Sequence, residues 1–284
     1  MKYIAIKTAQ MRLMATLLLL GVTFSAHAQY YMNIRQNDGT RLRYAVSSVD
    51  SIWFDNGDDE HECVDLGLKV KWATCNVGAE KPEDYGDYFA WGDTTTYYKP
   101  GYAQENPQNH WKEEYIDSYY DEIYGYEWTS YKYNIGDYDN NFIKYSTEGM
   151  MGNLGYNGFL DNLTTLVPDD DVAHAKWGGD WRMPTIEDYY ELVNNCDCEW
   201  TTQNGVNGLK VTSRKDSSLS IFLPAAGFRH DKNLEDFGSR GHYWLSSLET
   251  RFPMDGKSFE FFSNDVGGGG DLRCYGLSVR PVRP

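Results

Sequence analysis

The sequence predicts an α+β fold, with one strong helix among many short strands and no βαβ rhythm. The helix is expected over residues 185–196, where Pro184 precedes a capping Thr185 and Asp188 places an acid in the first turn. Its apolar stripe, at three-to-four spacing, comprises Ile186, Tyr189, Tyr190, Val193 and Cys196. Cys196 is therefore expected on the packed face, bridged or buried and not reactive.

Short strands account for most of the remaining domain. They are expected at residues 68–72, 209–211, 221–223, 243–245, 259–261 and 277–282. Asn204-Gly205 and Asn207-Gly208 are turn signals between them. No repeat of about 20–50 residues is present, which excludes solenoids and propellers.

Residues 1–28 have the pattern of a signal peptide. The basic residues are Lys2, Lys7 and Arg12, and the apolar run covers residues 13–24. The small-residue cleavage site is Ala26-His27-Ala28. The apolar run is too short to span a bilayer, which takes about 20 residues, and no Cys follows it for lipid attachment. The mature chain is therefore expected to begin at Gln29, to be periplasmic, extracellular or at the cell surface, and not to insert in the membrane.

The exported chain divides into four parts. Residues 29–54 are expected to form a small β hairpin around the turn Asn37-Asp38-Gly39, and a lone hairpin is marginal in water, so it should lean on the main domain or on another chain. Residues 55–62 form an acidic linker, and residues 63–284 form the main domain. Within that domain, residues 97–138 hold 11 tyrosines and few aliphatic side chains, which predicts a long ordered loop or insertion.

Net charge excludes two classes of partner. The chain has 42 acidic and 26 basic residues, a formal charge of −16. Removal of residues 1–28 takes away three bases and no acid, which leaves 23 bases and a charge of −19. Such a surface does not suit nucleic acid or electrostatic docking on anionic lipid.

The motifs of common enzymes and metal sites are absent from the sequence. There is no G-x-S-x-G, no H-E-x-x-H, no phosphate-binding loop and no C-x-x-C. The five cysteines therefore favour structural pairing or burial over metal ligation. The acids Asp169-Asp170-Asp171 could supply oxygens to calcium, but a solvated helix start ahead of residues 172–176 is the favoured interpretation.

The surplus of aromatic residues is the strongest functional signal. Tyrosine and tryptophan stack on the apolar faces of sugars and are common at protein interfaces. The candidate ligand-binding residues are Tyr97, Tyr98, Trp111, Tyr119, Tyr120, Trp128 and Tyr131. The alternative, that these side chains pack the segment onto the domain, stays open.

Several long motifs, in order, resemble one family. They are VDLGL (64–68), KWATCNVGA (71–79), PEDYGDYFAWG (82–92), WGGDWRMPT (177–185), FLPAAGFR (222–229), YWLSS (243–247) and SVRPV (278–282). Over residues 63–283 the chain resembles the Fibrobacter succinogenes major paralogous domain, found in exported bacterial proteins. This implies a C-type-lectin-like domain of short antiparallel strands with one or two helices, related to the formylglycine-generating enzyme, with its first and last strands side by side.

The resemblance also bears on chemistry and on the cysteines. The paired cysteines that hold copper in the enzyme branch are missing, since only Cys274 lies in that region, and the calcium-binding triplets of sugar-binding lectins are missing too. The resemblance implies a disulfide between Cys75 and Cys196, and more weakly one between Cys63 and Cys274. Cys198 is then left unpaired. The tryptophans that lie within the motifs, expected to be core or turn packing, are Trp72, Trp91, Trp181 and Trp244.

These observations favour a secreted, non-catalytic binding module that needs no cofactor. It would recognise a glycan or a surface protein through long loops, namely residues 97–138 and the variable-looking stretch 249–275. The alternative is a structural or tip subunit of a surface appendage, in which the N-terminal hairpin supplies strand pairing. An enzyme of the formylglycine-generating type is disfavoured.

Overall fold

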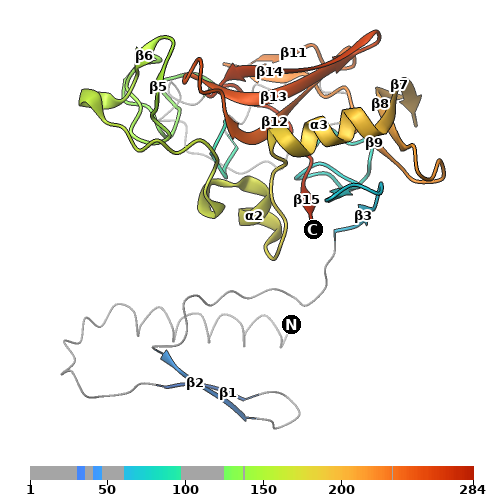
Figure 1. Cartoon of the computed structure of the whole chain (residues 1–284), viewed down its shortest axis with the longest axis horizontal. Helices are drawn as coiled ribbons and strands as arrows, with labels where there is room; N and C mark the ends of the chain where they lie inside the picture. The colour runs from blue at the N-terminus through green and yellow to red at the C-terminus, as the bar shows by residue number, and fades with distance from the viewer. Residues whose placement is uncertain (1–30, 36–40, 47–60, 97–124, 137, 232) are drawn as a thin grey trace, which may run out of the picture. The chain divides into compact units, whose positions relative to one another are not determined.

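A computed structural model describes residues 31–35, 41–46, 61–96, 125–136, 138–231 and 233–284 (Figure 1). The chain forms two compact units, Met1–Gly57 and Asp58–Pro284. The boundary between them falls inside the acidic stretch predicted as a linker. Within the described residues, no helix has the length and apolar character needed to cross a membrane.

The N-terminal unit contains the predicted hairpin. Strand β1 (Tyr31–Arg35) pairs antiparallel with β2 (Arg41–Ala45), with Tyr31 opposite Ala45 and Arg35 opposite Arg41. The guanidinium of Arg43 lies 3.7 Å from the ring centroid of Tyr31 on the neighbouring strand. This cation–π contact links the two strands by side chains as well as by backbone.

In its described residues the second unit is mostly β, with short antiparallel sheets and two α-helices (Figure 1). Its three-stranded sheets are β15-β4-β3 (Val282–Arg283, Lys71–Ala73, Cys63–Val64), β7-β8-β9 (Cys196–Gln203, Val206–Ser213, Ser220–Pro224) and β12-β13-β14 (Arg240–Leu248, Asp255–Phe262, Asp265–Leu272). Two small hairpins are β5-β6 (Glu148–Gly149, Gly152–Asn153) and β10-β11 (Phe228–His230, Asn233–Glu235). The described helices are α2 (Val172–Trp177) and α3 (Ile186–Asn195), with 3₁₀ turns at Tyr156–Gly158 and Pro168–Asp170.

Helix α3 confirms the local sequence signals. Thr185 and Asp188 form a reciprocal capping box, each accepting from the other's backbone N–H. Tyr189 is buried and stacks on Phe259 of β13, with ring centroids 5.0 Å apart. Tyr190 departs from the predicted stripe, because it is 52% exposed and lies at the margin of the packed face.

The ends of the second unit meet in one sheet. Strand β4 lies between β3 and β15, with Trp72 opposite both Val64 and Val282. The last strand, β15, therefore lies beside β4 and not beside the first strand, β3, whereas the resemblance implied that the first and last strands are neighbours. The strand predicted over residues 68–72 is shorter and later than expected, and it ends at Ala73, before Cys75.

Two other expectations are corrected. The stretch 249–275, expected as loops, is largely the β13–β14 hairpin, because eight consecutive residue pairs join its two strands. The acids of residues 169–171 do start a helix, but Asp170 and Asp171 are buried and not solvated. Asp171 caps α2 by accepting from the N–H groups of Ala173 and His174.

The four motif tryptophans lie in the core, as predicted. The indole of Trp91 donates to the carbonyl of Leu245 at 2.8 Å, and that of Trp244 donates to the carbonyl of Phe89 at 2.7 Å. These reciprocal bonds join residues 89–91 to β12. Tyr131, from the tyrosine-rich segment, in turn bonds to the carbonyl of Trp91.

Candidate functional site

The predicted ligand-binding aromatics divide into two groups. Those that lie outside the described residues are Tyr97, Tyr98, Trp111, Tyr119 and Tyr120. Tyr131 is described and is only 2% exposed, and its hydroxyl donates to the carbonyl of Trp91 at 2.8 Å. Trp128 is half-buried, with its ring centroid 5.7 Å from that of Tyr131 and 5.6 Å from that of Phe142. Trp128 and Tyr131 therefore pack the segment onto the domain, as in the alternative interpretation.

Tyrosine hydroxyls anchor the start of this segment. The hydroxyl of buried Tyr126 donates to the carbonyl of Tyr88 at 2.6 Å, and the hydroxyl of Tyr88 in turn donates to the carbonyl of Ala226. Buried tyrosine is stable where its O–H finds an acceptor, and here backbone carbonyls supply it. The tyrosine-rich composition thus serves a packed interior in the described part of the segment.

Asp170 is the polar centre beneath the segment. Its carboxylate accepts from the hydroxyls of Tyr133 and Tyr145, the latter at 2.6 Å. Lys144 lies 2.5 Å from one carboxylate oxygen and Lys132 lies 3.3 Å from the other. Four donors from residues 132–145 thus converge on one buried acid, so the segment is tied to the 3₁₀ turn before α2.

The pKa shifts at this centre have a clear cause. Burial opposes ionisation of Asp170, but the hydrogen bonds from Lys144, Tyr133 and Tyr145 outweigh it and lower the pKa of the carboxyl to about 2. Burial and the neighbouring carboxylate raise the pKa of both tyrosines. The centre is therefore an anionic acid held by neutral phenols and two ammonium groups.

Two further contacts fix the middle of the segment. Asp161 accepts from the N–H groups of Tyr145 at 2.7 Å and Ser146 at 2.9 Å, which closes the loop between them. Arg273, fully buried, donates to the carbonyls of Tyr145 and Pro253 and lies 4.2 Å from the ring centroid of Phe142. Residues 142–161 are therefore held by Asp161 and by Arg273, which directly follows β14.

Residues 135–160, most of which follow the predicted insertion 97–138, include eight large apolar side chains that are exposed. We call them the insertion surface; its members are Ile135, Tyr138, Ile143, Met150, Met151, Tyr156, Phe159 and Leu160. They are eight of the thirteen large exposed apolar residues in the described part of the chain. Met150 and Met151 are the turn of the β5–β6 hairpin, which Figure 1 shows at one end of the second unit, and they are 67% and 58% exposed.

Backbone bonds connect the parts of the insertion surface. Ile143 donates to the carbonyl of Tyr133 at 3.0 Å, and Tyr156 donates to the carbonyl of Phe142 at 2.8 Å. Met150 donates at 2.8 Å to the carbonyl of Arg251, the neighbour of exposed Phe252. Large apolar groups concentrated on one segment of a folded surface are typical of an interaction site.

Sequence reasoning missed the insertion surface. The candidates were chosen as Tyr and Trp, whereas most of the exposed side chains are Ile, Met, Phe and Leu. One signal was present in the sequence: two adjacent methionines between Gly149 and Gly152 place flexible apolar side chains in a turn.

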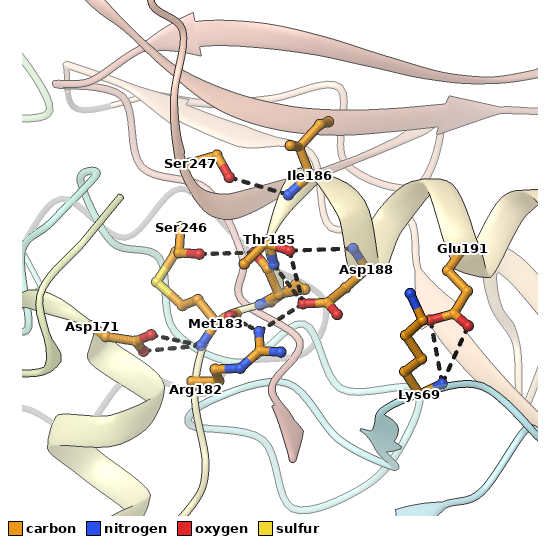
Figure 2. Close-up of polar contacts among 11 residues, drawn as sticks. Lys69, Asp171, Arg182, Met183, Thr185, Ile186, Asp188, Glu191, Ser246 and Ser247 are labelled. Atoms are coloured by element: carbon orange, nitrogen blue, oxygen red, sulfur yellow. Dashed lines mark hydrogen bonds and ion pairs between the residues drawn. The ribbon is translucent and has the colours of Figure 1, made fainter. Parts of the chain in front are cut away.

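The turn at residues 182–185 is held by polar contacts with neighbouring elements (Figure 2). Arg182 donates to Asp188 at 2.6 Å, and the carboxylate of Asp171 accepts from the N–H of Met183 at 2.8 Å. Ser247 of β12 accepts from the N–H of Ile186 at 3.1 Å. The turn therefore joins α2, α3 and β12, and its polar groups are used in that junction.

The five cysteines are free thiols in the structure. The implied pairs, Cys75 with Cys196 and Cys63 with Cys274, are not formed there and stay predictions. Cys196 is buried, as expected, and burial together with the nearby Cys198 raises the pKa of its thiol to about 11. Burial also raises the pKa of Cys75, Cys198 and Cys274, which lowers their thiolate fraction and their reactivity.

Among the described residues, no group of three or more His, Cys, Asp or Glu side chains could hold a metal ion. In comparisons with known proteins, no family model, no curated protein and no solved structure matches this chain.

Proposed function

We propose that this chain is a secreted, non-catalytic binding module with a C-type-lectin-like domain, and that its insertion surface engages a protein partner. The ordered series of motifs supports the lectin-like architecture, together with the pairing of β15 beside β4. The signal-peptide pattern of residues 1–28 supports export.

The observation that carries the proposal is the contrast between the two sides of one segment. Inward, Tyr131, Tyr145 and Phe142 are buried and tied to the domain by hydrogen bonds and ring contacts. Outward, Met150 and Met151 are exposed on the same segment. A segment that is already bonded to the domain loses less conformational entropy on binding than a free loop, which favours affinity.

The chemistry of the exposed side chains favours a protein over a glycan. Sugars need aromatic rings combined with hydrogen-bond donors, whereas protein interfaces are enriched in methionine and large apolar residues. Of the described candidate aromatics, Tyr131 already donates its hydroxyl within the domain. The insertion surface offers two tyrosines, Tyr138 and Tyr156, among six aliphatic, methionine or phenylalanine side chains.

A binding screen on the mature chain tests this function. Protein and glycan arrays are probed with the wild type and with Met150→Ser/Met151→Ser, and dissociation constants are measured for each hit. We expect a protein hit whose affinity falls about tenfold or more in the double variant, as for removal of interface anchors.

Phe237→Ser is the matched control, because Phe237 is an exposed apolar residue on another part of the second unit. It should bind like the wild type. Hits confined to glycans, or a protein hit with equal affinity for Met150→Ser/Met151→Ser, would contradict the proposal.

A further inference from the structure

Strand β14 is an edge strand whose four central residues have no side chains. It is the outermost member of the β12-β13-β14 sheet, and its residues 267–270 are all glycine. A Cβ placed on Gly267 or Gly269 would meet nothing within 4 Å, so the face of the sheet is open at these two positions. The opposite edge of the sheet is covered, since β12 forms bridges with Gly227 and Ser278.

The edge lacks the usual protection against strand addition. Edge strands are commonly blocked by lysine, by proline or by a bulge, and β14 contains neither residue and pairs with β13 in unbroken register. Every second residue of such a strand directs its N–H and C=O away from the sheet. Among the described residues, no strand pairs with the outer edge of β14, so its backbone N–H and C=O groups can pair with an added strand.

Acidic groups surround this template. Asp265 and Asp271 lie at the two ends of β14, and Asp255 lies opposite Leu272 on β13. Burial is the main cause that raises the pKa of Asp255 to about 6, and the charges of Asp271 and Glu249 add to it. Two β14 edges paired with each other would bring these acids together, so a symmetric pairing is disfavoured.

The N-terminal hairpin has the complementary properties. Residues 31–45 contain three arginines and one acid, whereas residues 63–284 contain 20 basic and 35 acidic residues. Arg41 and Arg43 alternate along β2 and are exposed. A two-stranded hairpin is marginal in water and gains stability from a third strand, and both of its strands are edges.

We propose that strand β2 of one copy of this chain adds to the edge of β14 in a second copy. The added strand would pair with the glycine backbone, and Arg41 and Arg43, two residues apart on β2, would lie beside Gly269 and Asp271, two residues apart on β14. Because the two surfaces differ, the contact is head-to-tail and continues from copy to copy as an open chain. The association concerns a surface distinct from the insertion surface and does not depend on the proposed function.

Sedimentation velocity of the chain without residues 1–28, over low to high micromolar concentration, tests the inference. The wild type should show a mass that rises with concentration and falls with added salt. Gly269→Lys places a base in open space beside the incoming arginines and should weaken association by about tenfold or more. Gly269→Asp, the matched control, changes the same position with the opposite charge and should associate at least as well as the wild type.

A charge exchange completes the test. By itself, the double variant Arg41→Glu/Arg43→Glu should weaken association. Combined with Gly269→Lys it should restore association, because the two surfaces again carry opposite charges. Gly267→Lys serves as a second variant if Gly269→Lys loses its near-ultraviolet circular dichroism. A wild type that stays monomeric throughout, including one whose hairpin docks on its own domain, overturns the inference, as does equal association of both Gly269 variants.

Discussion

The hydroxyl of Tyr145 donates a 2.6 Å hydrogen bond to the buried carboxylate of Asp170, 25 residues further along the chain. The same hydroxyl accepts from the backbone N–H of Val167 at 3.0 Å. One phenol thus links the inner side of the insertion segment to the 3₁₀ turn that precedes α2. Residues 132–145, which carry exposed Ile135 and Ile143, are thereby held to the domain at this acid.

Asp170→Asn should destabilise the second unit by about 3 kcal/mol, since it leaves buried donors without their charged acceptor. Lys144, Tyr133 and Tyr145 all bond to this carboxylate. Urea unfolding at neutral pH measures the loss. Asp169→Asn is the control, because Asp169 is the exposed neighbour and should change the free energy of unfolding by less than about 0.5 kcal/mol.

The pH dependence of unfolding gives a separate readout of Asp170. Its folded pKa, about 2, lies below the ordinary value of 3.8, so its contribution is present above about pH 4 and is lost as pH falls toward 2. The wild type should lose this increment in that window and Asp170→Asn should not. Parallel acid unfolding curves for the two proteins would show that the carboxylate does not stabilise the fold.

The contribution of Asp255 to stability should depend on pH in the opposite direction from that of Asp170. Burial and the charges of Asp271 and Glu249 raise its folded pKa to about 6, so the folded state holds its proton more tightly than the unfolded state. Stability therefore falls as pH rises from about 4 to 6 and stays lower above that range. Asp255→Asn removes this dependence and should raise the free energy of unfolding at pH 7 by about 1 kcal/mol after allowance for solvent screening.

Urea unfolding of Asp255→Asn at acidic and neutral pH measures this effect. The gain should vanish below about pH 4, where the wild-type carboxyl is protonated as well. Asp265→Asn is the matched control, since Asp265 is exposed at the start of β14. An equal gain at both pH values would assign the effect to packing and not to charge.

Replacement of Arg280 by lysine should lower the free energy of unfolding. Its Nε donates to Asn76 at 2.8 Å and its Nη1 donates to the carbonyls of Ala73 and Thr74, all in the interior beside β4. A lysine ammonium cannot reproduce this planar fork, so Arg280→Lys should cost about 2 kcal/mol in urea unfolding. Arg251→Lys, at an exposed position, should cost less than about 0.5 kcal/mol, and equal costs would contradict the role of the fork.

Local signals explain which elements could be predicted. Helix α3 follows from a capping box and apolar spacing within ten residues, and strands β8, β9, β12 and β13 follow from short apolar runs. Strand β14 has four glycines and low strand propensity, so its conformation comes from pairing with β13. Asp170 was misjudged as solvated because its donors come from residues 132–145, and that contact is not encoded by spacing.

The insertion surface could not be predicted for a related reason. Periodicity separates inner from outer side chains only in helices and strands, and residues 125–166 are mostly irregular. Composition indicated an aromatic-rich insertion, but not that Tyr131 faces the core while Met150 faces solvent. That distinction depends on tertiary bonds such as the one from Tyr131 to Trp91.

Tyr131→Phe separates a packing role from a binding role at a position first considered for ligand contact. The ring stays buried but the bond to the carbonyl of Trp91 is lost, so the free energy of unfolding should fall by about 1 kcal/mol. Affinity for a protein partner of the insertion surface should stay within about twofold of the wild type, because the hydroxyl is not exposed. Tyr138→Phe is the control for stability, since Tyr138 is exposed and should unfold like the wild type. Unchanged stability with lost binding in Tyr131→Phe would show instead that this hydroxyl serves a ligand and that the segment opens to receive it.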